Sequence, residues 1–202
     1  MNFTMNADLL FATPLYMFEI SNASSMNSKL EKQAVEMSTK DKGLILSNVK
    51  GWHSDVDLQM NPDYKDIIDF IKASSIEVCK ARGLKDSYFP FIKAAWFNIN
   101  KKGAFNRKHT HPWCMFSGVY YVKTPENCGD LIIDDPRAVE VHNPLPDVDK
   151  TKLPIFFKPA VSIKPVAGRL YIFPSYVPHS VDPNESDEDR ISIAFNITIK
   201  SY

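Results

Sequence analysis

Apolar and polar residues alternate without a break near the end of the chain. On one face of this extended segment are Ile191, Ile193, Phe195, Ile197 and Ile199, and on the other are Arg190, Ser192, Ala194, Asn196 and Thr198. Side chains point in alternating directions along a strand, so the pattern predicts a strand with two different environments. The apolar face suits packing under helices, and the polar face suits the lining of a wet cavity.

Similar runs of β-branched and aromatic residues, separated by Pro, Gly, Asn and Asp, fill the chain from residue 91 onward. They predict the strands Ile92–Ile99, Met115–Lys123, Asp130–Asp134, Ala160–Lys164, Arg169–Phe173 and Arg190–Lys200. Many short strands with a polar inner face favour a double-stranded β-helix, the jelly roll also used by cupins. Residues 141–159 contain four prolines and few strand signals, which predicts a long loop near the mouth of a site.

Helical spacing replaces alternation in the first 90 residues. The pattern predicts a short strand at Leu15–Ile20, a polar surface helix at Ser28–Lys40 and an amphipathic helix from Asn61-Pro62 to Gly83. The 202 residues are long enough for one real core. We therefore expect a single domain, 1–202, that is mainly β with flanking helices: a helical N-terminal flank, 1–90, packs on a jelly-roll core, 91–202.

Composition narrows the classes of partner. Lys+Arg and Asp+Glu number 24 each, so the chain lacks the global basic field that draws proteins to nucleic acid or anionic membranes. A small-molecule, peptide or protein substrate is favoured instead. Cys79, Cys114 and Cys128 match no paired metal spacing and are interpreted as reduced thiols. The sequence shows neither a signal peptide nor a membrane span, which predicts a cytoplasmic protein.

Three histidines carry the candidate chemistry. His109 and His111 are separated by one residue, and His179 follows the segment FPSYVP. Two histidines at i and i+2 of an extended segment point the same way, so both imidazoles can reach one metal ion. A distant third histidine can complete a face of ligands and leave open positions on the metal. A lone His-x-His is more often surface decoration, so the hypothesis depends on the combination.

Arg190 strengthens this combination. It lies eleven residues after His179, on the polar face of the alternating strand, and Ser192 shares that face. The planar guanidinium fork suits a carboxylate. Taken alone, Arg190 would be interpreted as a salt-bridging residue beside Asp187, Glu188 and Asp189.

Four segments together resemble the iron(II)- and 2-oxoglutarate-dependent oxygenase superfamily, especially a group of small, largely uncharacterised oxygenases of bacteria and phages. They are NINKKGAFNRKHTHPWCMFSGVYY, GDLIIDDPR, GRLYIFPSYVPHSV and RISIAFN. The superfamily pattern has a histidine, any residue and a carboxylate, then a later histidine and an arginine about ten residues on that anchors 2-oxoglutarate. His109, His179 and Arg190 match these positions.

The resemblance implies the cofactors and the reaction. Fe(II) and the co-substrate 2-oxoglutarate are expected, with hydroxylation of an unidentified protein, peptide or small molecule and release of succinate and CO2. If the chain is encoded by a phage, the expected location is the host cytoplasm.

His111 departs from the pattern, because it occupies the carboxylate position. A neutral imidazole there removes one negative charge from the metal ligands. The leading hypothesis is an iron site built from His109, His111 and His179. In the alternative, only one of the first two histidines binds, and Asp130, Asp134 or Asp135 supplies a carboxylate.

Two further residues are candidates for binding 2-oxoglutarate. Tyr121 lies in SGVYYV, where related prolyl-hydroxylase-like enzymes place a tyrosine that contacts the oxoacid. Strand parity allows only one of Tyr120 and Tyr121 to face the site, and Tyr121 is chosen. Asn98 lies on the face of Ile92, Ala94 and Trp96, and either lines the pocket or bonds a neighbouring loop.

Other residues are assigned ordinary roles. A structural salt bridge is the expected role of Arg137, and Trp113 and Phe173 are expected in the core or the pocket wall. His53 and His142 have no partner pattern.

A competing hypothesis is a three-histidine, cupin-like metal-binding protein or dioxygenase that does not use 2-oxoglutarate. Arg190 discriminates between the two, because an arginine on the cavity wall has a direct purpose only opposite a dicarboxylate.

Overall fold

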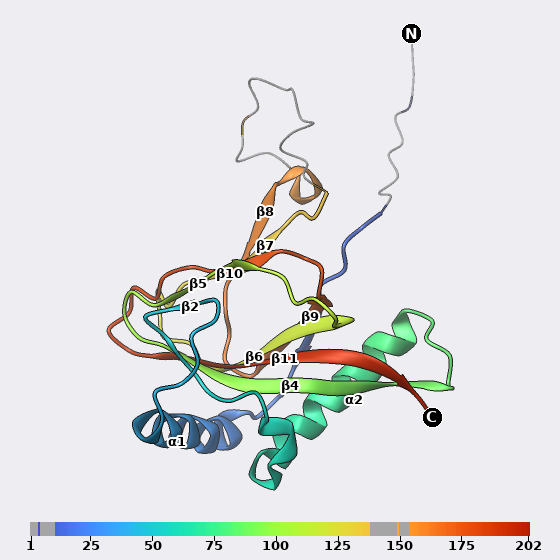
Figure 1. Cartoon of the computed structure of the whole chain (residues 1–202). Helices are drawn as coiled ribbons and strands as arrows, with labels where there is room; N and C mark the ends of the chain where they lie inside the picture. Colours follow the sequence, from blue (N-terminus) through green and yellow to red (C-terminus); the bar gives the residue numbers. More distant parts are fainter. Residues whose placement is uncertain (1–3, 5–10, 138–148, 150–153) are drawn as a thin grey trace.

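Two antiparallel sheets form the centre of the molecule in the computed structural model, which describes residues 4, 11–137, 149 and 154–202 (Figure 1). The major sheet has six strands in the order β1-β9-β6-β11-β4-β3, and the minor sheet has five in the order β2-β5-β10-β7-β8. The described part of the chain is mainly β with flanking helices, and the jelly-roll prediction is confirmed.

The strands of the major sheet are β1 (Tyr16–Glu19), β3 (Trp52–His53), β4 (Tyr88–Asn100), β6 (Phe116–Lys123), β9 (Arg169–Pro174) and β11 (Arg190–Ser201). Those of the minor sheet are β2 (Asn48–Val49), β5 (Phe105–His109), β7 (Leu131–Asp134), β8 (Ala160–Ile163) and β10 (His179–Val181). All six strands predicted from residue 91 onward are therefore present, with ends shifted by a few residues.

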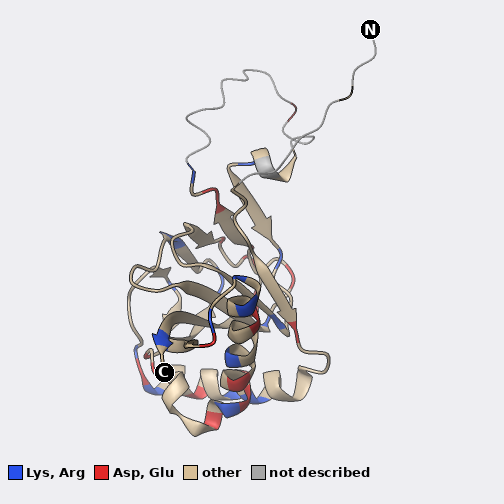
Figure 2. Cartoon of the chain, turned by 90° about the vertical axis from the view of Figure 1, so that its right-hand side faces the viewer, with Lys and Arg blue, Asp and Glu red and all other residues tan. Residues whose placement is uncertain are grey.

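Two helices, α1 (Ser24–Lys40) and α2 (Lys65–Ala81), cover the outer face of the major sheet (Figure 1). A short 3-10 turn, Pro62–Tyr64, leads into α2, and the Asn61 side chain accepts a hydrogen bond from the Asp63 amide at 2.9 Å. Further 3-10 turns lie at Leu58–Met60 and Ile155–Phe157. Basic and acidic residues are interspersed along the helices (Figure 2). No helix in the described ranges is long and apolar enough to cross a membrane.

The alternation in β11 divides the molecule as predicted. Ile191, Ile193 and Phe195 are buried in the main core, together with apolar residues of both helices. The opposite face of β11, including Arg190 and Ser192, lines a cavity. The strand therefore separates the helical layer from the site.

At the start of β4, the prediction that Ile92 shares a face with Ala94 and Trp96 is wrong. The pairing with β11 shifts register opposite Asn196–Ile197, where Asn196 pairs with Ala94 but Ile197 pairs with Ile92. Lys93 is thus an extra residue, and a bulge of this kind reverses the direction of the preceding side chain. Ile92 consequently lies in the main core, whereas Ala94 lines the cavity.

The sequence pattern did not predict the short strands. β2, β3 and β10 have two or three residues each and β5 has five, which is too short for alternation to be recognised. The division at residue 90 stays a prediction, although β1, β2 and β3 precede it and join the sheets. Of the predicted loop at 141–159, residues 149 and 154–159 are described, and His142 lies outside the described residues. Cys79, Cys114 and Cys128 are free thiols, as predicted.

Candidate metal and oxoacid site

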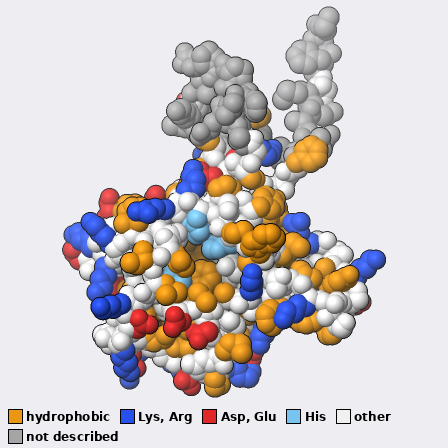
Figure 3. Space-filling view, viewed as in Figure 1, with side chains coloured by type: hydrophobic (Ala, Val, Ile, Leu, Met, Phe, Trp, Pro, Cys, Tyr) orange, Lys and Arg blue, Asp and Glu red, His pale blue; other side chains and the backbone are white. Residues whose placement is uncertain are grey.

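A cavity of about 570 Å³ is bounded by side chains of both sheets. This volume lies in the usual range for small-molecule sites. On the face seen in Figure 3, histidine side chains are visible near the centre, beside hydrophobic side chains. Among the residues that the structure describes, the charged side chains that line the cavity are Arg107, Lys108 and Arg190, all of them basic.

The minor sheet brings the three predicted histidines together. His109 ends β5 and His179 begins β10, where the two residues are direct register partners. His111 lies two residues beyond β5 and outside the strand, with its backbone N–H donating to Ser175 O at 3.0 Å. The candidate ligand atoms of the three side chains all lie within 4.8 Å of one another. The segment that follows β5, just before the turn at 112–113, therefore brings His111 to the other two histidines.

Backbone carbonyls orient two of the rings. Nδ1 of His109 donates to Arg107 O at 2.7 Å, and Nδ1 of His179 donates to Val177 O at 3.0 Å. With Nδ1 protonated, Nε2 of each ring keeps its lone pair, which is the arrangement of a histidine that binds a metal.

His111 has a different partner. Its Nδ1 lies 3.3 Å from Nδ2 of Asn196, and Oδ1 of Asn196 accepts a hydrogen bond from Ser117 Oγ at 2.8 Å. In this orientation the amide donates to Nδ1, so the proton of the neutral ring is on Nε2. Turning the amide over would place Oδ1 against Nδ1–H and free Nε2, and the Ser117 hydroxyl can serve as donor or acceptor in either case.

Burial keeps the cluster neutral. Burial first, and then the neighbouring imidazoles, lower the pKa of His111 to about 3 and the pKa of His179 to about 4. Burial also lowers the pKa of His109. Neutral imidazoles at physiological pH are what a metal requires.

The major sheet supplies a row of polar residues across four strands. Ser192 on β11 pairs with Tyr121 on β6 and with Asn98 on β4, and Asn98 pairs in turn with His53 on β3. All four residues line the cavity. Tyr120, by contrast, is in the core, where its hydroxyl donates to Asn27 Oδ1 at 2.6 Å.

Arg190 lies beside this row and is 2% exposed. Its Nη1 donates to the carbonyl oxygens of Cys128 and Gly129 at 3.1 and 3.2 Å, and its buried Nε has no partner in the described part of the chain. The alternative suggested by the sequence, a salt bridge with Asp187, Glu188 or Asp189, is not formed; Asp187 pairs with Lys102 at 2.6 Å.

Tyr121 is suited to donate a hydrogen bond next to Arg190. Burial raises the pKa of its hydroxyl well above the usual range, although the nearby guanidinium opposes the shift. The hydroxyl is therefore protonated at physiological pH, and it can act as a donor to an anion.

The aspartates considered as alternative ligands do not belong to the histidine cluster, although Asp134 lies near enough to His179 to raise its pKa. None of them lines the cavity. Asp130 accepts a hydrogen bond from Ser162, Asp134 pairs with Lys108 at 2.6 Å, and Asp135 pairs with Arg137 at 2.6 Å. The last contact is the structural role that was expected of Arg137.

The structure places Trp113, Phe173 and His53 differently with respect to the cavity. Trp113 is 89% exposed, so its assignment to the core or pocket wall was wrong; it lies in a turn with φ of +66°. Phe173 is buried in the cavity wall against His179, as expected. His53, taken from the sequence as ordinary, lines the cavity and is buried. No local signal could identify it, because its partner Asn98 is on another strand.

Comparisons with known proteins agree with this geometry. Residues 94–196 match a family model described as "Putative 2OG-Fe(II) oxygenase". A search of curated proteins finds no match.

Several solved structures share the fold. A prolyl-4-hydroxylase from Pseudomonas putida is 16% identical with a TM-score of 0.64, over 94% of each chain. A prolyl hydroxylase from Trichoplax adhaerens, in complex with a hypoxia inducible factor peptide fragment, is 14% identical with a TM-score of 0.60, over 91% of this chain and 83% of the other. SnoK, an alpha ketoglutarate dependent carbocyclase from nogalamycin biosynthesis, is 9% identical with a TM-score of 0.66, over 92% and 79%. At these identities the similarity shows the fold alone.

Proposed function

The chain belongs to the 2OG-Fe(II) oxygenase family, and from this premise we propose that it is an iron(II)- and 2-oxoglutarate-dependent dioxygenase. It would hydroxylate a peptide, protein or small molecule and release succinate and CO2. The similar structures include both a prolyl hydroxylase bound to a peptide and the carbocyclase SnoK.

The observation that carries the proposal is the buried Arg190 in the same cavity as the three histidines. Removing a cation from water is costly unless an anion or several hydrogen bonds compensate. Within the described ranges, the hydrogen bonds of Arg190 go to two carbonyl oxygens, and its Nε has no partner. A carboxylate of 2-oxoglutarate would supply the missing acceptor. Ser192 and Tyr121 on the adjacent row would complete its binding, whereas Asn98 lies farther along the row, next to His53.

The histidine cluster fits an iron(II) ion. Its rings are neutral, and His109 and His179 already expose Nε2, while His111 does so once the Asn196 amide is turned. These three nitrogens would hold the metal on one face and leave other positions open. When bound there, iron(II) supplies the chemistry that couples oxidative decarboxylation of 2-oxoglutarate to insertion of one oxygen atom into a substrate C–H bond.

A turnover assay tests the proposal. The iron(II)-loaded chain is expected to convert 2-oxoglutarate to succinate under air, and His179→Gln and Arg190→Met to abolish this. Calorimetry should show that Arg190→Met weakens 2-oxoglutarate binding by roughly 30-fold or more, because a charge-assisted bidentate contact is lost.

Arg137→Met is the matched control, since this arginine is exposed and pairs with Asp135. Arg137→Met should change neither the rate of succinate formation nor the affinity for 2-oxoglutarate. If the metal-loaded chain fails to bind 2-oxoglutarate, or if Arg190→Met binds it as tightly as the unaltered chain, the proposal is wrong. The all-histidine cluster would then favour a metal site or dioxygenase that works without the oxoacid.

A further inference from the structure

His53 is the fourth member of the polar row, and the oxoacid site does not need it. The row runs from Tyr121 through Ser192 and Asn98 to His53, so His53 lies at the end opposite Tyr121. Side chains of directly paired residues in antiparallel strands are ~5 Å apart, which places the His53 and Asn98 side chains next to each other. His53 is 2% exposed, yet it borders the cavity.

The His53 ring presents a hydrogen-bond acceptor. Its Nδ1 lies 2.6 Å from Ser54 O, and because a carbonyl can only accept, Nδ1 carries the proton. Burial lowers the pKa of His53, so the ring is neutral and its Nε2 holds a lone pair. No described residue donates to Nε2.

Trp96 fixes the orientation of this ring. The two rings are stacked with centroids 5.2 Å apart and planes at 12°, and Trp96 also lines the cavity on the side of His111. The wall formed by His53, Trp96, Val56 and Ala94 is otherwise apolar and carries no charged side chain.

Asn98 adds a second unsatisfied group. Its Oδ1 is buried without a partner in the described ranges, and its side-chain amide also offers N–H donors. Beside one another, His53 and Asn98 thus present acceptors and a donor to whatever enters this end of the cavity. An amide, which has an N–H and a carbonyl oxygen, complements such a pair.

We propose that His53, Asn98 and Trp96 form the subsite for the primary substrate and that it takes an uncharged amide, such as a peptide group or a carboxamide. The amide N–H donates to Nε2 of His53, its carbonyl oxygen accepts from Asn98, and Trp96 covers its apolar neighbour. The subsite rests on the proposed function, because only there does the cavity hold a substrate in addition to 2-oxoglutarate. A carboxylate is rejected at His53, since a lone pair would face an anion.

Benzamide and benzoate are a matched pair of probes for the subsite, because they share a ring and differ in the amide. Long-range proton–nitrogen NMR on the full chain reports the state of each imidazole. Benzamide should shift the Nε2 resonance of His53 in a saturable way, and benzoate should leave it unchanged.

Two variants separate the hydrogen bond from the packing. His53→Phe keeps a ring stacked on Trp96 but removes the acceptor, and should weaken benzamide binding roughly three- to tenfold. His53→Gln retains an acceptor and should recover part of the affinity. If His53→Phe does not fold, the NMR shift in the unaltered chain still tests whether the amide binds at His53.

Each ligand is also tested against the variant of the other site, so that the amide subsite and the 2-oxoglutarate site are examined separately. His53→Phe should leave 2-oxoglutarate affinity unchanged, and Arg190→Met should leave benzamide affinity unchanged. Absence of benzamide binding, an equal response to benzoate, or full affinity in His53→Phe would overturn the subsite while 2-oxoglutarate still binds. Loss of 2-oxoglutarate binding alone would instead reject the oxygenase proposal.

Discussion

Hydrogen-bond partners give chemically identical residues different properties in this cavity. His109, His179 and His53 each donate Nδ1–H to a backbone carbonyl, which fixes the proton away from Nε2. His111 faces a side-chain amide instead. Because an amide can be turned and a carbonyl cannot, His111 is the one member of the cluster whose tautomer is adjustable.

Asn196 should therefore control metal affinity. Asn196→Asp provides a permanent acceptor for Nδ1–H of His111, frees Nε2 and adds a negative charge near the metal, so metal affinity should rise roughly tenfold or more. Asn196→Leu should lower it by a similar factor. Competition with a chelator measures both affinities.

Thr198→Ala is the control, because Thr198 lies two residues further along the same face of β11 and outside the cavity lining. Equal metal affinity in Asn196→Asp and Thr198→Ala would show that the amide does not influence His111.

The depressed pKa of His179 predicts how stability changes with pH in the metal-free chain. The pKa is about 4 in the fold against an ordinary value of 6.5, so between these values the unfolded chain binds a proton that the folded chain does not. The contribution of His179 to the free energy of unfolding is therefore fully present above about pH 6.5 and is lost as the pH falls toward 4. Urea unfolding should show a loss from His179 of about 2 kcal/mol between about pH 7 and pH 5. His179→Gln should remove this part of the pH dependence; an unchanged profile would contradict the shift.

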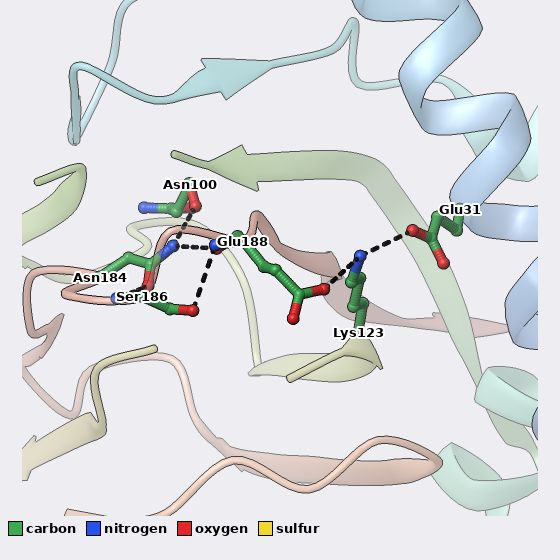
Figure 4. Close-up of polar contacts among 6 residues, drawn as sticks. All are labelled: Glu31, Asn100, Lys123, Asn184, Ser186 and Glu188. Atoms are coloured by element: carbon green, nitrogen blue, oxygen red, sulfur yellow. Dashed lines mark hydrogen bonds and ion pairs between the residues drawn. The ribbon is translucent and has the colours of Figure 1, made fainter. Parts of the chain in front are cut away.

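Among the structural elements, β11 depends on the loop that precedes it. Asn184, which is fully buried, donates through Nδ2 to Asn100 O and Glu188 O at 2.8 Å each and accepts from the Ser186 amide at 2.9 Å (Figure 4). Glu188 lies two residues before Arg190. Asn184 therefore fixes the backbone from which the buried arginine enters the cavity.

Asn184→Ala should lower the free energy of unfolding by roughly 2–4 kcal/mol, because it leaves buried carbonyl oxygens without a donor. It should also weaken 2-oxoglutarate binding through displacement of Arg190. Chemical unfolding and calorimetry measure the two effects.

Lys123→Met provides the comparison within the same network. Lys123 bridges Glu31 and Glu188 at 3.1 Å each, but Glu188 is largely exposed (Figure 4). The loss should be below about 1 kcal/mol. If the two variants are equally stable, Asn184 is not the anchor of the loop.

At the scale of the whole molecule, the helices and the major sheet share one core. Tyr64, at the start of α2, packs edge-on against Phe97 of β4 at 5.5 Å, and Phe70 of α2 packs edge-on against Tyr120 of β6 at 6.2 Å. The hydroxyl of Tyr120 also bonds Asn27 of α1. These contacts join the N-terminal flank to the strands that line the cavity.

The chain should consequently unfold in one cooperative step. Far-ultraviolet circular dichroism follows the helices and near-ultraviolet circular dichroism follows the aromatic packing of the sheet, and their thermal midpoints should coincide. Two separate transitions would show that residues 1–90 form an independent unit.

The sequence predicted six of the strands from residue 91 onward, the two helices and the two faces of β11, because these depend on local periodicity; it missed β5 and β10. It also singled out Arg190 and the three histidines. It failed where a single inserted residue changes a face, as at Lys93, and where a strand has only two residues, as at β3. It misassigned Trp113 because hydrophobicity alone does not reveal an exposed turn.

The sequence by itself thus determined which side chains share a face of a strand, because alternation is a property of the backbone between neighbouring residues. Only the tertiary structure decided which faces meet. Strand register aligned His53 with Asn98 and Ser192, and the pairing of β5 with β10 brought the end of β5 and the following His111 to His179. Partners distant in sequence set the state of His111 and gave Nη1 of Arg190 its acceptors, while Nε of Arg190 has none in the described part of the chain. Such pairings arise only when the sheets are assembled.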